Sequence, residues 1–142
     1  MPRPHRPLQP DSWYHVTNRG LDRQNIFRCD LDRKRFLELI AQATSVHEIE
    51  VHAYCLMGNH FHLLVHTPKG NLDKAMHRAM SMYVREFNQQ HGRDGPLFKS
   101  RYFASLIQDD GYLLAVTRYI HRNPIDLGAV DLAKYRLSLI HI

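Results

Sequence analysis

The chain has 142 residues, 44% of them hydrophobic, and a formal net charge of +5, which is the composition of one folded, basic domain. No apolar window is long enough to cross a bilayer, and the first residues lack the apolar segment of a secretory signal. The sequence has two cysteines and no CxxC pair, which excludes a disulfide framework and a cysteine zinc site. We therefore expect one cytoplasmic domain over residues 1–142, with Cys29 and Cys55 as buried thiols and a polyanion as partner of the excess positive charge.

The first third of the chain predicts an arm, a strand and a helix. Residues 1–11 are rich in proline and basic side chains and predict a flexible, extended arm, because proline fixes φ and donates no backbone hydrogen bond. The aromatic and β-branched residues of 13–19, ended by a glycine, predict a first strand. Asp30 or Asp32 is then expected to cap a helix that runs to about His47. Its apolar residues recur at helical spacing: Phe36, Leu37, Ile40 and Ala43.

The middle of the chain predicts a β-hairpin, a second helix and a fourth strand. Residues 51–56 and 60–66 have the composition of strands, and the Gly-Asn dipeptide between them suits a tight turn. The segment 72–90 carries one apolar helical face. After a break that contains glycine and proline, residues 97–108 hold enough aromatic and aliphatic side chains for a strand.

A last helix is predicted from Asp109 or Asp110 to about Asn123, because Pro124 disfavours helix at the preceding residue. The order strand, helix, two strands, helix, strand is that of the ferredoxin-like split βαβ fold. We therefore expect an α+β protein with one antiparallel sheet, helices on one face and an added C-terminal helix. This fold serves RNA binders, metal chaperones and enzymes alike, so function has to be argued from particular residues.

Two histidines in the predicted hairpin are the first candidate functional residues. His60 and His62 are expected to point to one face of the sheet and Phe61 to the other, because successive side chains of a strand alternate. Two neighbouring imidazoles can hold one metal ion. For an arbitrary His-x-His pair, a packed histidine beside a surface histidine is the commoner explanation, so the pair alone does not establish a metal site.

A second cluster lies in the predicted last helix. Tyr119 and Asn123 are four residues apart, which puts the phenol and the carboxamide on one helix face, one turn apart. Mg²⁺ and Mn²⁺ accept carboxamide oxygen and Mn²⁺ also accepts imidazole, so Asn123 is a candidate third ligand. The sequence contains neither the His-Glu-x-x-His of zinc proteases nor the Gly-x-Ser-x-Gly of serine hydrolases.

Several strings in this order and spacing resemble the REP-associated tyrosine transposases, relatives of the single-tyrosine HUH insertion-sequence transposases. They are Thr17-Asn18-Arg19-Gly20, the helix start from Asp30 to Leu37, Met57-Gly58-Asn59-His60-Phe61-His62-Leu63-Leu64-Val65, Gly95-Pro96-Leu97-Phe98-Lys99-Ser100-Arg101-Tyr102 and Arg118-Tyr119-Ile120-His121-Arg122-Asn123-Pro124. The resemblance covers nearly the whole chain.

The resemblance implies a site and a reaction. His60 and His62 match the family's two-histidine metal motif, Tyr119 matches its nucleophile, and Asn123 stands where the third metal ligand is often Gln. Enzymes of this family cut single-stranded DNA beside a folded hairpin and leave a 5′-phosphotyrosine link and a free 3′-hydroxyl. We therefore expect Mg²⁺ or Mn²⁺ as cofactor, single-stranded or hairpin DNA as partner, no membrane association, and a monomer or homodimer.

Basic and aromatic side chains near these strings are candidates for DNA contact. Tyr102 or Phe103 could stack unpaired bases, although strand core explains one of them equally well. Tyr112, two helical turns before Tyr119, is the rival nucleophile. The residues expected to hold phosphates are Arg19, Lys99, Arg101, Arg118 and Arg122.

Two other functions remain open from the sequence. A domesticated relative could bind DNA or RNA hairpins through its basic face without cutting them. A replication initiator or relaxase of the same superfamily is disfavoured by the small size and the lack of a helicase domain. The complete set of metal-site and tyrosine residues favours the cutting enzyme.

Overall fold

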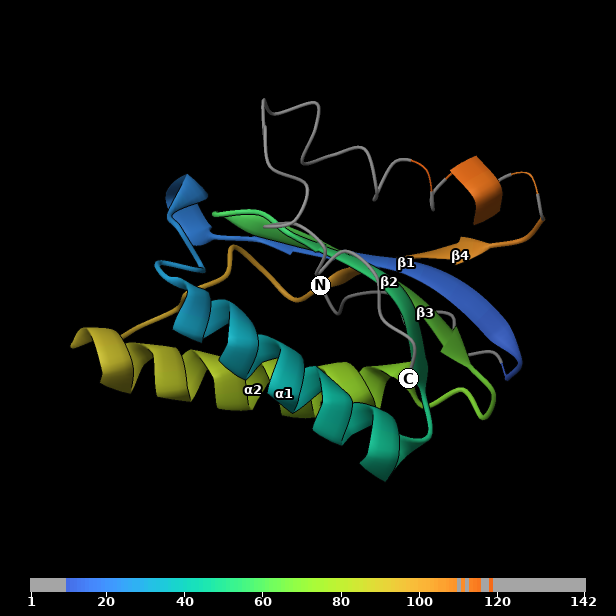
Figure 1. Cartoon of the computed structure of the whole chain (residues 1–142), viewed down its shortest axis with the longest axis horizontal. Coiled ribbons are helices and arrows are strands. Elements are labelled where there is room, and N and C mark those ends of the chain that lie inside the picture. Colours follow the sequence, from blue (N-terminus) through green and yellow to red (C-terminus); the bar gives the residue numbers. More distant parts are fainter. Residues whose placement is uncertain (1–9, 110, 112, 116–117, 119–142) are drawn as a thin grey trace, which may run out of the picture.

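The computed structural model describes residues 10–109, 111, 113–115 and 118. Within them the chain forms one four-stranded sheet with two long helices on one of its faces (Figure 1). The elements are β1 (Ser12–Arg19), the short 3₁₀ turn η1 (Leu21–Arg23), α1 (Asp30–His47), β2 (Glu50–Leu56), β3 (His60–Thr67), α2 (Leu72–His91) and β4 (Phe103–Ile107).

The strand order is β2-β3-β1-β4, and every neighbouring pair is antiparallel. This order and the α1 and α2 crossovers are those of the ferredoxin-like fold, so the expected α+β class is confirmed. None of the helices within the described residues is both long and apolar enough to span a membrane.

The two faces of the sheet have different surroundings. On the helix side, alternate residues of the central strands are fully buried against α1 and α2, among them Tyr14, Val16, Phe61 and Leu63. On the opposite, open side, a smaller apolar cluster gathers around Leu64 and Ile107.

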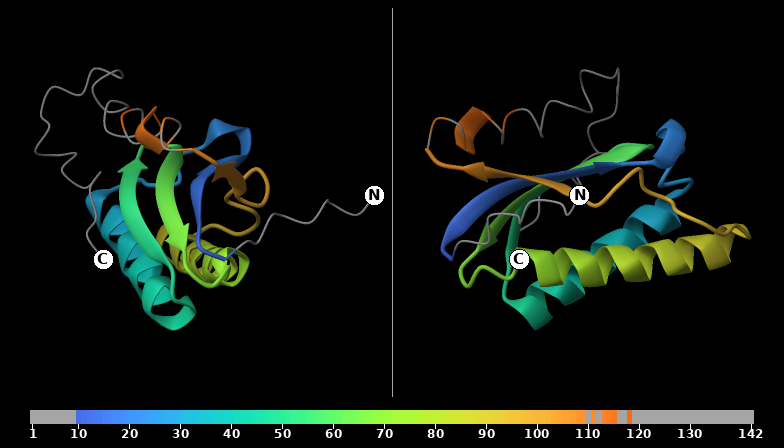
Figure 2. Two further views of the ribbon diagram at one scale, coloured as in Figure 1. Left: turned by 90° about the vertical axis from the view of Figure 1, so that its right-hand side faces the viewer. Right: turned by 180° about the vertical axis from the view of Figure 1, so that it is seen from behind.

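Leu113 packs against this smaller cluster on the open side. The residues described at 111, 113–115 and 118 are helical. Figures 1 and 2 show this short helical stretch, in orange, across the sheet from α1 and α2. The chain therefore returns over the open face after β4.

The fourth strand is shorter than expected. It begins at Phe103, not Leu97, and ends at Ile107. Before it, the chain from Leu97 to Tyr102 is irregular and forms no ladder with β1: an isolated bridge joins Gly20 to Phe98, and single hydrogen bonds join Lys99 to Arg19 and Ser100 to Asn18. Leu97 and Tyr102 are buried nevertheless, which explains why this loop has the composition of a strand.

The start of α1 also differs in detail from the expectation. Its N-cap residue is Cys29, which makes no side-chain capping bond and is exposed, so only Cys55 of the two thiols is buried as predicted. Asp30 is the first helical residue rather than the cap. Asp32 reaches back to accept a hydrogen bond from the Arg28 backbone N–H at 2.9 Å, which stabilises the chain just before the helix.

Candidate active site on the open face of the sheet

A cleft of about 660 Å³ lies where β1 ends and β3 and β4 begin. The Gly58-Asn59 turn that leads into β3 forms one wall, and the loop before β4 forms another. The backbone holds these segments together: Gly20 N–H donates to Asn59 O at 2.8 Å, and Lys99 N–H donates to Arg19 O at 3.0 Å. The residues around the cleft are Thr17, Asn18, Arg19, Arg23, Asn59, His60, His62, Lys99, Ser100, Arg101 and Phe103.

His60 and His62 lie on the open face, as strand alternation predicts. Their rings are 5.2 Å apart between centroids and nearly perpendicular, at 87°. Phe61 between them is fully buried on the helix side and contacts the ring of Phe36. His62 is buried, whereas His60 is half-buried and faces the cleft.

A third histidine, His15 of β1, joins this pair and was not foreseen from the sequence. In the antiparallel register Thr17 lies opposite His62, so His15 is the diagonal neighbour of His62 on the same face. The Nε2 atom of His15 lies 3.0 Å from Nδ1 of His62, and the two rings stack at 19°. One of these nitrogens donates to the other, which fixes the orientation of the His62 ring. The register of β1 against β3 would be needed to find His15.

Asn59 orients the other histidine of the pair. Its Oδ1 atom lies 2.7 Å from Nδ1 of His60. With the proton on Nδ1, His60 donates to this carboxamide oxygen and keeps the lone pair of Nε2 for a ligand. His60 and His62 thus each use Nδ1 for a neighbour within the protein.

Burial keeps the three imidazoles neutral. It lowers the pKa of His15 and of His60, and it lowers the pKa of His62 to about 3, with smaller contributions from the charges of His15 and His60. Neutral imidazole is the form that binds metal ions. The donor set of His60 and His62 therefore fits a divalent ion that accepts nitrogen, such as Mn²⁺, and a carboxamide or phosphate oxygen could complete it.

The cleft is strongly positive. Arg19, Arg23, Lys99 and Arg101 all line it and are exposed, and its described lining residues include no carboxylate. Phosphate groups are the natural occupants of such a surface. Arg23 was not among the predicted DNA-binding residues, because it reaches the cleft through η1, a short turn for which the sequence has no clear signal.

Of the two aromatic candidates for base stacking, Phe103 is available. Its side chain is 67% exposed and lines the cleft. Tyr102 is buried, and its hydroxyl donates to Asp73 Oδ1 at 2.8 Å. Its ring therefore packs in the hydrophobic core and is not available to stack on a base.

The remaining predicted residues belong to the chain after β4. Arg118 is helical and exposed. Tyr119, Arg122 and Asn123, and the rival Tyr112, lie outside the described residues.

The chain matches one family model, described as "Transposase IS200 like", over residues 9–123. A protein of Haemophilus influenzae assigned as a REP-associated tyrosine transposase is 27% identical over 110 residues, which cover 70% of this chain and 62% of that protein. The chain thus spans less than two thirds of the length of this curated relative.

Two solved structures have similar folds. A REP-associated tyrosine transposase bound to a REP hairpin superimposes with a TM-score of 0.71 at 16% identity, over 96% of this chain and 81% of that chain. A protein from Deinococcus radiodurans R1 assigned as a transposase gives 0.56 at 14% identity, over 84% and 96%. Because the family model covers most of its length, the chain belongs to the IS200-like transposase family.

Proposed function

We propose that this protein is a metal-dependent enzyme that cuts and rejoins single-stranded DNA beside hairpins through a 5′-phosphotyrosine link to Tyr119. The observation that carries the proposal is the convergence of His60 and His62 with a group of exposed arginine and lysine side chains in one cleft. A metal-binding pair at the floor of a phosphate-binding surface suits phosphodiester chemistry. The family membership and the hairpin-bound structural neighbour agree with it.

The DNA backbone would occupy the positive cleft. Arg19, Lys99 and Arg101 line the same cleft as the histidine pair and can hold phosphates next to the cut. Phe103 offers an exposed ring on which an unpaired base can stack. The Phe103 contact favours single-stranded over double-stranded DNA, because the faces of paired bases are covered by their neighbours in a duplex.

His60 and His62 would hold the metal ion, Mg²⁺ or Mn²⁺, with Asn123 as the third protein ligand. When bound, the ion would polarise the scissile phosphate and stabilise the charge that develops on the leaving 3′-oxygen, an effect worth several kcal/mol. His15 and Asn59 position the two imidazoles through their hydrogen bonds to the Nδ1 atoms.

Tyr119 would be the nucleophile. Its oxygen forms a bond to the scissile phosphorus while the bond to the 3′-oxygen breaks, which leaves a 3′-hydroxyl on one strand and the 5′-phosphate on the tyrosine. With an ordinary pKa near 10, only about 0.1% of a free tyrosine is ionised at pH 7, which amounts to roughly 4 kcal/mol against the reactive form. A positive cleft lowers this cost, because cationic side chains favour the phenolate. The covalent link retains the phosphodiester energy, so attack by a 3′-hydroxyl can rejoin strands without ATP.

The experiment that tests the function uses a single-stranded DNA that carries a hairpin and is labelled at one end. We expect the wild-type chain to cut it at one position near the stem with Mn²⁺, and to leave it intact with EDTA. The same strand annealed to its full complement is the matched control and should not be cut. Tight binding of the hairpin without cutting by Mg²⁺ or Mn²⁺ would instead favour the binding module, which needs only the positive cleft.

A further inference from the structure

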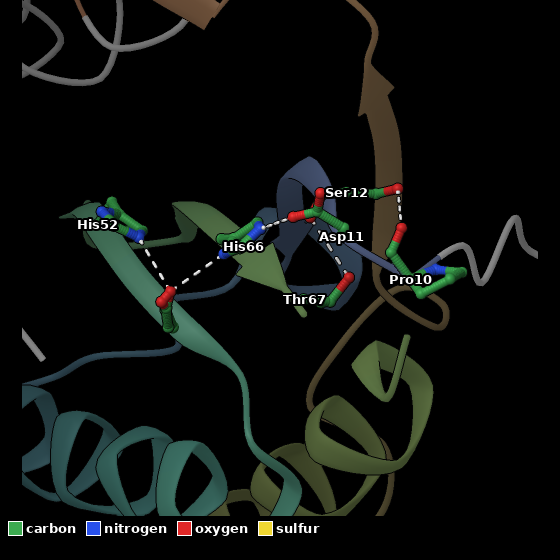
Figure 3. Close-up of polar contacts among 7 residues, drawn as sticks. Pro10, Asp11, Ser12, His52, His66 and Thr67 are labelled. Atoms are coloured by element: carbon green, nitrogen blue, oxygen red, sulfur yellow. Dashed lines mark hydrogen bonds and ion pairs between the residues drawn. The ribbon is translucent and has the colours of Figure 1, made fainter. Parts of the chain in front are cut away.

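A second cluster of metal-binding side chains lies on the open face at the other end of β3. Glu50 and His52 come from β2, and His66 comes from β3, directly opposite Glu50 in the register. One donor atom from each of the three lies within 4.8 Å of the other two. Figure 3 shows His52 and His66 on either side of a shared carboxylate.

The distances within this cluster suit a small cation. Nδ1 of His66 lies 3.0 Å from Oε1 of Glu50, and Nε2 of His52 lies 3.8 Å from the same oxygen. Ligands at 2.0–2.2 Å in a tetrahedral site are about 3.4 Å apart, between these two values. Small side-chain adjustments would therefore bring the three donors onto one ion.

Neighbouring residues hold His66 as metal-binding histidines are commonly held. Its other nitrogen, Nε2, lies 2.9 Å from Oδ1 of Asp11. Burial lowers the pKa of His66, but the hydrogen bonds to Glu50 and Asp11 outweigh it and raise the pKa, so an ion that binds Nδ1 displaces the proton that Nδ1 donates to Glu50. Trp13 packs against both imidazoles, with its ring centre 4.4 Å from that of His52 and 4.8 Å from that of His66. The side chain of His52 is 42% exposed, which leaves room for water at the remaining coordination positions.

This cluster is separate from the cleft. His66 lies six residues beyond His60 along β3, which corresponds to about 20 Å in an extended strand. A single ion cannot be shared between the two groups.

We propose that Glu50, His52 and His66 form a second metal site, for a transition-metal ion that prefers nitrogen ligands, such as Zn²⁺. Two imidazoles and one carboxylate are a donor set that Zn²⁺ and Co²⁺ accept readily, whereas Mg²⁺ demands oxygen ligands. Through Asp11 and Trp13 the ion connects the start of β1 to the β2–β3 hairpin. Its role is structural, and it does not depend on the proposed DNA chemistry.

Trp13 makes the site measurable, because it is the only tryptophan of the chain and lies against two of the ligands. We expect Co²⁺, added to the full chain after EDTA treatment and dialysis, to quench Trp13 fluorescence in a saturable way. Excess Zn²⁺ should reverse the quenching. Glu50→Gln and His52→Gln each remove one ligand from the surface and should weaken Co²⁺ binding by at least about tenfold.

Two controls separate this site from other histidines. His77→Gln removes an exposed histidine of α2 and should leave the Co²⁺ titration unchanged. The double variant His60→Ala/His62→Ala should still show the quenching, and circular dichroism checks that each variant is folded. The proposal is overturned if wild type shows no saturable quenching up to millimolar Co²⁺, or if folded Glu50→Gln and His52→Gln variants bind Co²⁺ as wild type does.

Discussion

Tyr119→Phe is expected to abolish cutting of a hairpin-bearing single strand, with a loss on the order of 10⁴-fold or more in the cutting rate. The substitution removes one hydroxyl and keeps the ring, so the apolar contacts of the side chain and the helix propensity hardly change. The loss would therefore come from the missing nucleophile and not from unfolding. The cutting rate on the labelled strand with Mn²⁺, measured beside the affinity for the same DNA, separates the two effects, because binding should be unchanged.

Tyr112→Phe is the matched control for this substitution. Tyr112 lies two helical turns earlier in the predicted helix and has no carboxamide four residues further on. We expect this variant to cut at the wild-type rate. If Tyr119→Phe cuts normally while Tyr112→Phe does not, the nucleophile has been assigned to the wrong tyrosine.

His60→Ala is expected to remove cutting while most of the DNA affinity remains. The imidazole is one of the three protein ligands in the proposed metal site. Loss of a Lewis-acid contribution of several kcal/mol corresponds to a rate loss of about a thousandfold or more. Non-specific affinity comes mainly from Lys and Arg contacts to phosphates, and these are untouched. The single-turnover cutting rate and the dissociation constant, both measured with Mn²⁺, test this separation.

Lys99→Ala in the same cleft should show the opposite pattern. The side chain is exposed, and its removal deletes one phosphate contact, so the affinity falls and the salt dependence of binding loses about one unit of slope. Cutting at saturating DNA should be affected less than in His60→Ala. The metal role of His60 would be contradicted if His60→Ala cut DNA as fast as wild type. It would also be contradicted if His60→Ala lost as much DNA affinity as Lys99→Ala.

The fold was predictable because its signals are periodic and local. The helical spacing of Phe36, Ile40 and Ala43 fixes the buried face of α1. Alternation along β3 places His60 and His62 together and sends Phe61 into the core. The predicted start of β4 at Leu97 was wrong, because Leu97 and Tyr102 are buried although they belong to an irregular loop. Apolar residues without alternation do not distinguish a buried loop from a strand.

The site residues that could not be predicted from the sequence are brought to the cleft by contacts between segments far apart in the chain. His15 meets His62 only through the register of β1 against β3, across 47 residues of sequence. Arg23 enters the cleft from a short 3₁₀ turn that contains positive φ angles at Asp22 and Arg23. Nothing in a local pattern specifies either arrangement, whereas the 2-residue spacing of His60 and His62 is itself local.

The second histidine cluster illustrates the same limit. His52 and His66 lie on different strands, 14 residues apart in the sequence, so no local spacing pairs them. Only the pairing of β2 with β3 brings Glu50 opposite His66. The carboxylate that joins the two histidines is therefore visible in the structure and not in the sequence.

A covalent link between Tyr119 and DNA is the central step of the reaction that we propose for this IS200-like chain. The most direct test is to incubate the wild-type protein with hairpin-bearing single-stranded DNA and Mn²⁺, digest the protein and the DNA of the trapped complex, and locate the modified peptide by mass spectrometry. We expect a nucleotide joined through its 5′-phosphate to Tyr119. A linkage on another residue, or cut DNA with a free 5′-phosphate and no modified peptide, would contradict the claim.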